Sequence, residues 1–146
     1  MSLFQKAHEN AGPVTFNDKE ATLALLFLAV TADGDIAPEE EELVIAASNR
    51  MKLLRKQSID EFNGMVWKIR EAIEASGRDA VFEASVKGVP PDLNETIYAL
   101  CADIVFAEDS ANPSELEYLR REQEALQISD EFATKVIEVM RVMNRG

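Results

Sequence analysis

The sequence is poor in the residues that carry redox and nucleophilic chemistry. Among 146 residues there is one cysteine, Cys101, and one histidine, His8. A single cysteine excludes an internal disulfide framework and is consistent with a reducing compartment. One histidine without a second His or Cys nearby makes no transition-metal site, and no Ser-His-Asp or Cys-His set can be assembled. No glycine-rich phosphate loop is present, because four glycines stand isolated along the chain: Gly34, Gly64, Gly77 and Gly88. These absences predict that the protein is not an enzyme.

Long apolar runs and positive charge are also scarce. The longest apolar run, from Ala21 to Ala32, is shorter than the about 20 residues that cross a bilayer, so we expect no integral membrane segment. The amino terminus has no secretion-signal pattern, which favours a cytoplasmic location. With 15 basic and 27 acidic residues, the formal net charge is -12. Such a charge argues against nucleic acid or an anionic membrane as partner, and it favours cations or basic protein surfaces.

What the sequence does contain is helix signals. No stretch alternates with a period of two, and 47% hydrophobic residues are enough for one core. We therefore expect an all-α fold, a compact bundle of about seven helices in a single domain, 1–146. Its predicted parts are a first repeat at about 17–56, connecting helices at 58–88, a second repeat at about 92–128 and a final helix at 130–144.

Capping residues mark where these helices begin. Asn17, followed by Glu20, predicts a helix through about Thr31 that is apolar on every side and therefore buried all round. Similar capping signals occur later in the chain, at Ser58 with Glu61, at Asn112 with Glu115, and at Ser129. Gly77 and Gly88 are predicted helix stops.

The apolar faces of the later helices predict which side chains are buried. The helix after Ser58 carries an apolar face, and Trp67, near its edge, is expected to pack rather than to bind. The helix after Asn112 is expected to bury Leu116, Leu119 and Leu126. Cys101 lies among apolar neighbours with no basic residue within a helical turn, so we interpret it as a core residue.

One stretch occurs twice. Residues 23–44 read LALLFLAVTADGDIAPEEEELV, and the chain from Ile97 reads IYALCADIVFAEDSANPSELEYL. Sliding the first copy onto the second places Ala32 on Ala107 and Pro38 on Pro113. Two copies of one helix-turn-helix unit are the simplest interpretation, and each unit is a natural packing partner for the other.

The turns inside the two units are rich in carboxylates. Calcium and magnesium take oxygen ligands, and closely spaced acids on a turn before a helix supply them. An EF-hand is excluded, because Pro38 stands where that loop needs glycine. A looser site remains open, shared between the copies if their turns lie on one face. The candidate metal ligands are Asp33, Asp35, Glu39, Glu40, Asp103, Glu108, Asp109 and Glu115. The alternative is that these acids only cap helices and solvate a surface.

Asp103 stands out because its helix is otherwise apolar and its counterpart in the first copy is Leu28. A carboxylate there either faces solvent along a thin seam or is buried and paired, since an isolated buried charge is costly. Arginine is the usual partner of such a group. We expect an arginine pair, with a ligand role as the alternative.

The chain resembles the tellurite-resistance TerB family over nearly its whole length. The motif that carries the resemblance is the first turn, Ala32-Asp33-Gly34-Asp35-Ile36-Ala37-Pro38-Glu39-Glu40, with its looser copy at 107–115. The resemblance implies a compact, all-helical, cytoplasmic bacterial protein of tellurite and stress resistance that is non-enzymatic. It also implies that the protein binds a divalent metal or a metal-binding partner, such as another tellurite-resistance protein. The second copy departs from the pattern, because Glu108-Asp109 replaces the usual Asp-Gly.

Three functional hypotheses follow. The first is a binding module that presents an acidic face to a divalent cation (calcium, magnesium or zinc) or to a basic or metal-carrying protein. The second is a metal-dependent hydrolase in which Asp33, Asp35, Glu108 and Asp109 converge on one cleft. The third is an acidic helical scaffold whose charge serves solubility alone.

Overall fold

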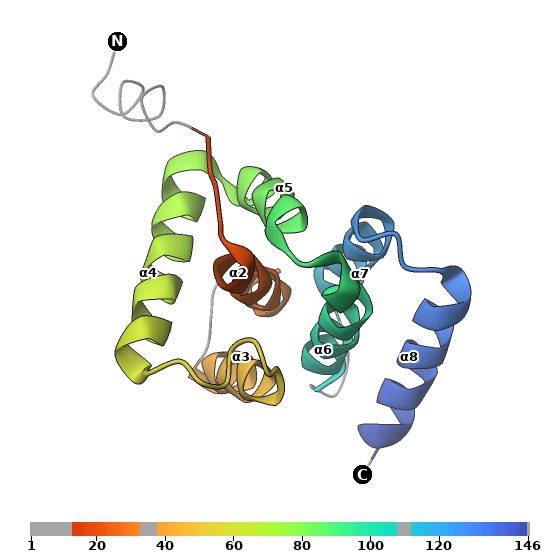
Figure 1. Cartoon of the computed structure of the whole chain (residues 1–146). Helices are drawn as coiled ribbons and strands as arrows, with labels where there is room; N and C mark the ends of the chain where they lie inside the picture. The colour runs from red at the N-terminus through yellow and green to blue at the C-terminus, as the bar shows by residue number, and fades with distance from the viewer. Residues whose placement is uncertain (1–12, 33–37, 108–111, 146) are drawn as a thin grey trace.

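The computed structural model describes residues 13–32, 38–107 and 112–145 (Figure 1). These residues form seven α-helices, one short 3-10 turn and no strand, as the predicted all-α class requires. The helices are α2 (Asp18–Val30), α3 (Pro38–Arg50), α4 (Ile59–Ser76), α5 (Arg78–Gly88), α6 (Asn94–Phe106), α7 (Pro113–Ala125) and α8 (Asp130–Met143), with the 3-10 turn η1 at Pro91–Leu93. None of these helices is both long enough and apolar enough to cross a membrane.

Helix α2 lies at the centre of the molecule and contacts α3, α4, α5, α6 and α7 (Figure 1). Every residue from Ala21 to Val30 is buried, which confirms the prediction of a helix buried on all sides. Leu23, Leu25 and Leu26 are fully buried, and each contributes roughly 1.5–3 kcal/mol by leaving water. Helices α3 to α7 are therefore arranged around this apolar helix.

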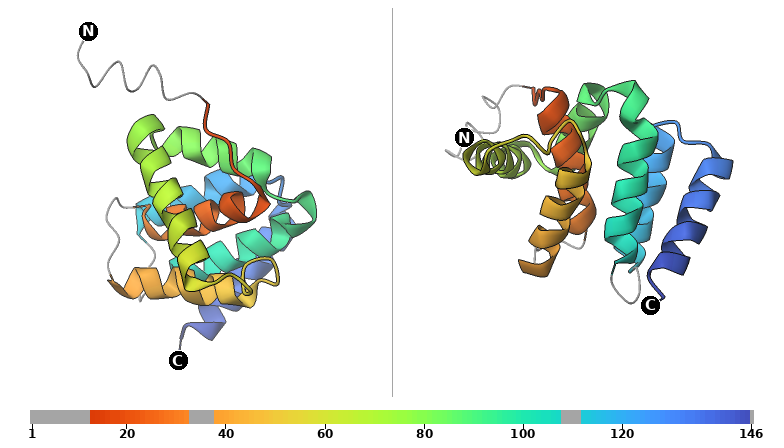
Figure 2. Two further views of the ribbon diagram at one scale, coloured as in Figure 1. Left: turned by 60° about the vertical axis from the view of Figure 1, so that its left-hand side comes forward. Right: turned by 60° about the horizontal axis from the view of Figure 1, so that its bottom comes forward.

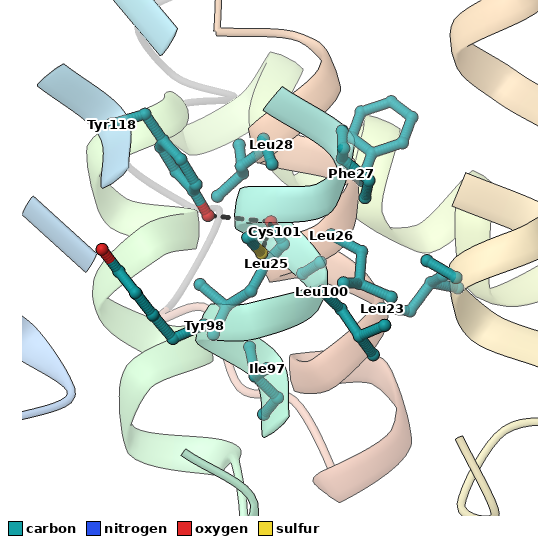
Figure 3. Packing of buried hydrophobic residues seen from close by; sticks show 14 of the residues in the cluster. Leu23, Leu25, Leu26, Phe27, Leu28, Ile97, Tyr98, Leu100, Cys101 and Tyr118 are labelled. Carbon is teal, nitrogen blue, oxygen red and sulfur yellow. Dashed lines mark hydrogen bonds between the residues drawn. The ribbon is translucent and has the colours of Figure 1, made fainter. Parts of the chain in front are cut away.

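Helix α3 lies against α2, and two pairs of helices cover other sides of α2. Helices α4 and α5 cover one side, and α6 with α7 covers another. The contact between α2 and α6 is made by apolar side chains, among them Leu25, Ile97 and Cys101, all of which have no exposed surface (Figure 3). Helix α8 packs on α6, away from α2.

The predicted capping residues begin their helices. Asn17 accepts a hydrogen bond from the Glu20 amide at 2.8 Å, and the Glu20 carboxylate accepts one from the Asn17 amide at 3.0 Å. Asn112 makes the same reciprocal pair at the start of α7, and the Ser58 and Ser129 side chains cap α4 and α8. Between α4 and α5, Gly77 has a φ of 88°, a conformation that side chains with a Cβ rarely adopt.

Two residues that the sequence predicts to be packed, one on α7 and one on α4, are exposed in the structure. Leu116 is 44% exposed, because α7 turns Glu115, Tyr118, Leu119 and Glu122 inward instead. Trp67 is 65% exposed rather than packed. It lies two residues before Ile69, the most deeply buried residue of α4, and so roughly 160° round the helix from it.

Candidate functional site

The two predicted helix-turn-helix units present their helix ends on the same side of the molecule. In both views of Figure 2, α2 and α6 end on one side, and α3 and α7 begin there. Helix starts carry partial positive charge from the helix dipole, which stabilises carboxylates placed in the first turn. This side of the molecule is the candidate functional site, because the predicted acidic ligands stand next to these helix ends in the sequence.

Half of the eight predicted metal ligands lie outside the described residues. This holds for Asp33, Asp35, Glu108 and Asp109. The backbones of Glu39 and Glu40 form part of the first turn of α3, but their side chains are outside the described part. Within the part of the chain that the structure describes, no three His, Cys, Asp or Glu side chains come together as a metal-binding group.

Asp103 is paired, as the sequence predicts. Its carboxylate lies 3.2 Å from the Arg50 guanidinium, and its side chain is 32% exposed. Arg50 ends α3, so the pair connects the first predicted repeat to the second. An ion pair with this exposure contributes at most about 1 kcal/mol, so its main consequence is that one Asp103 oxygen already has a cationic partner.

Glu115 is occupied by its role as a cap. Its carboxylate accepts a hydrogen bond from the Asn112 amide at 3.1 Å, and its own amide donates to the Asn112 side chain at 2.9 Å. The residue is buried. The capping box therefore accounts for Glu115 without any bound metal.

The most unusual ionisable group in the described structure is Glu122, which sequence reasoning missed. It lies on α7 with no exposed surface, and neither carboxyl oxygen has a hydrogen-bond partner among the described residues. A carboxylate without partners is costly in the protein interior. Burial accordingly raises the pKa of Glu122 to about 8. At neutral pH the side chain is mostly a neutral carboxylic acid.

The two polar neighbours of Glu122, Tyr118 and Cys101, donate their hydrogen bonds to a backbone carbonyl rather than to the Glu122 carboxyl group. The Tyr118 hydroxyl donates to the Leu25 carbonyl at 2.8 Å, and the Cys101 thiol lies 3.6 Å from the same oxygen (Figure 3). Both groups are near enough to oppose the rise in the Glu122 pKa, but desolvation outweighs them. Burial, followed by the nearby Glu122, raises the pKa of the Cys101 thiol well above its usual value. Cys101 is thus a protonated core residue, as predicted, and supplies no thiolate.

A sequence signal for Glu122 exists. It stands three residues after Leu119 and four before Leu126, in the middle of the buried stripe of α7. A charged residue at an apolar position of a helix is the pattern of a buried carboxyl. No family model, curated protein or solved structure matches this chain, so the residues themselves carry the functional interpretation.

Proposed function

We propose that this protein is a non-catalytic binding module, similar to the tellurite-resistance TerB family, that acts in the cytoplasm. In this proposal, the side on which α2 and α6 end binds a divalent cation, or a protein that carries one. The observation that carries the proposal is the arrangement of the two hairpins, α2–α3 and α6–α7, whose connected ends lie on the same side of the molecule. The described helix ends that flank the two acidic stretches of the sequence therefore lie on one side of the molecule.

The charge of the chain supports the same proposal. The formal net charge of -12 raises the local concentration of cations around the protein. The positive end of a helix such as α3 or α7 stabilises carboxylates placed near it by about 0.3–1 kcal/mol each at low salt. Carboxylates at these helix starts are therefore stable in the charged form before any cation binds. A bound cation must compete with the helix dipoles for these carboxylates, which lowers its net binding free energy. We therefore expect binding in roughly the micromolar to millimolar range rather than tight, structural binding.

Calorimetric titration with calcium, magnesium and zinc tests the proposal. The variant Asp33→Asn/Asp35→Asn removes two carboxylates from the first turn. The matched control is Asp92→Asn/Glu95→Gln, which removes the same charge where α6 begins, at the opposite end of that helix from the candidate site. Both control residues are exposed, so the fold should tolerate the change.

The expected result is saturable heat from at least one metal with the native protein and with the control variant. The turn variant should bind at least tenfold more weakly, because two of the carboxylate ligands are gone. Equal weakening in both variants would mean that net charge alone attracts the metal. The absence of heat from the native protein at millimolar metal would contradict cation binding altogether.

A further inference from the structure

Helix α4 has an outward stripe that no other described element covers. The residues at spacings of four and three along it are Asp60, Gly64, Trp67, Glu71 and Glu74, and all five are exposed. We call this set the α4 stripe. Helix α4 lies at the periphery of the molecule, contacting α2 and α5, and it is remote from α8 (Figure 1). The stripe lies on the side of α4 opposite Ile69, which is buried.

The basic residues of α4 do not neutralise the stripe, because both reach toward α2. Lys68 binds the Glu20 carboxylate at 2.9 Å. Arg70 lies over the Phe27 ring, with 5.5 Å between the guanidinium carbon and the ring centroid. None of the ion pairs among the described residues involves a carboxylate of the stripe. The stripe therefore combines an aromatic ring with uncompensated negative charge.

Two residues of the stripe have no structural explanation within the fold. Trp67 is 65% exposed, although burial would stabilise so large an apolar side chain. Gly64 lies inside a helix, where glycine is unfavourable, and a Cβ built on it would meet nothing within 4 Å. Neither packing nor backbone conformation requires glycine there. Local departures of this kind are expected at functional sites, where a partner supplies the missing reason.

We propose that the α4 stripe is a docking surface for an extended basic segment of another protein. A lysine or arginine side chain of the partner lies over the Trp67 ring, as cations do on aromatic faces. Neighbouring basic side chains pair with Glu71 and Glu74 on one side of the ring and with Asp60 on the other. The bare backbone at Gly64 lets the partner main chain approach the helix closely.

The length of the stripe sets the length of the partner. From Asp60 to Glu74 the helix rises about 21 Å, which an extended chain spans with about six or seven residues. The charge of the stripe selects a basic partner and repels nucleic acid. This inference does not rest on the proposed function, because it concerns a different helix face, and either can fail while the other holds.

The test uses the full chain and a short synthetic peptide in which arginine alternates with serine. An otherwise identical peptide with glutamine in place of arginine is the neutral control. Trp67 is the only tryptophan in the chain, so its fluorescence reports on the stripe directly. Calorimetry measures the affinity of variants, including those that lack the tryptophan.

The arginine peptide, but not the glutamine peptide, should shift the Trp67 emission in a saturable way. The variant Trp67→Ala should bind about three- to thirtyfold more weakly, the range expected for a cation over an aromatic ring. Gly64→Ala should also bind more weakly while unfolding at a higher temperature, which separates a loss of binding from a loss of stability.

Charge-matched variants distinguish docking from general attraction. Glu71→Gln/Glu74→Gln should lose affinity several-fold, whereas Glu95→Gln/Glu138→Gln, which removes the same charge from exposed positions on α6 and α8, should lose much less. Equal losses in the two pairs, or an unchanged Trp67 emission at saturating peptide, would overturn the proposal. A dimer that disappears with Trp67→Ala would also overturn it, because the stripe would then bind a second copy of the chain.

Discussion

Replacing Glu122 with glutamine should change how the stability of the protein depends on pH. Glu122 is fully buried, and neither of its oxygens has a hydrogen-bond partner among the described residues. Its pKa rises from 4.5 to about 8 in the folded protein because the charged form is desolvated. Between these two values the folded chain keeps a proton that the unfolded chain has lost.

The sign of the effect follows from proton binding. Below about pH 4.5 both states are protonated at Glu122, and the residue costs nothing through ionisation. As the pH rises from 4.5 toward 8, the unfolded state loses its proton first, so the free energy of unfolding falls by about 1.4 kcal/mol per pH unit. This amounts to about 3 kcal/mol at pH 7 and about 5 kcal/mol above pH 8, a large part of the stability of a typical domain.

The assay is urea unfolding, followed by circular dichroism, of the native chain and of Glu122→Gln between pH 4.5 and 8. The glutamine amide is as buried as the carboxyl, so the absolute difference between the proteins mixes two effects, and only its change with pH is diagnostic. We expect the variant to gain about 3 kcal/mol relative to the native chain between pH 4.5 and 7. The exposed neighbour Glu124 provides the control, because Glu124→Gln should show no such gain. A difference between native and Glu122→Gln proteins that stays constant with pH would refute the reasoning.

Two further predictions concern packing and a buried hydrogen bond. A Cβ on Gly88 would lie 2.8 Å from the Ala21 Cβ, so Gly88→Ala should destabilise the fold by about 1–3 kcal/mol, whereas Gly64→Ala should stabilise it by about 1 kcal/mol. Thermal unfolding of the two variants measures both, and equal shifts in one direction would contradict the packing argument. Tyr118→Phe removes the donor to the Leu25 carbonyl and should cost about 1 kcal/mol in urea unfolding; an unchanged midpoint would mean that this hydrogen bond contributes nothing.

The central helix and the helix starts were predictable from the sequence because their causes are local. Asn17 and Glu20 stand directly before the apolar run and cap the helix that it forms. A helix that is apolar on every side can only be stable when it is buried. The sequence predicted that Asp103 pairs with an arginine, but it did not predict which arginine. Arg50 lies 53 positions away, and only the packing of α3 against α6 brings the two together.

The residues that sequence reasoning misplaced depend on how each helix is rotated about its axis. Leu116 and Glu122 lie on the same helix, and counting apolar residues selects the leucine as the buried one. Glu122 is buried because it follows Tyr118 by four residues and Leu119 by three, which places it on the same inward face of α7. Trp67 is exposed for the same kind of reason, since Ile69 fixes the inward side of α4. The predicted ligands at 33, 35, 108 and 109 lie outside the described residues, so their role stays a prediction.

The most direct test of the central proposal is the location of a bound cation. Manganese takes the same oxygen ligands as magnesium and broadens the nuclear magnetic resonance signals of nearby amides. Titrated into isotopically labelled protein, it should broaden amides at the ends of α2 and α6, such as Thr31 and Ala107, and at the starts of α3 and α7, all at the same metal concentration. Amides where α6 begins should stay sharp. Broadening of only one hairpin, or of amides scattered evenly over the surface, would contradict a shared cation-binding side.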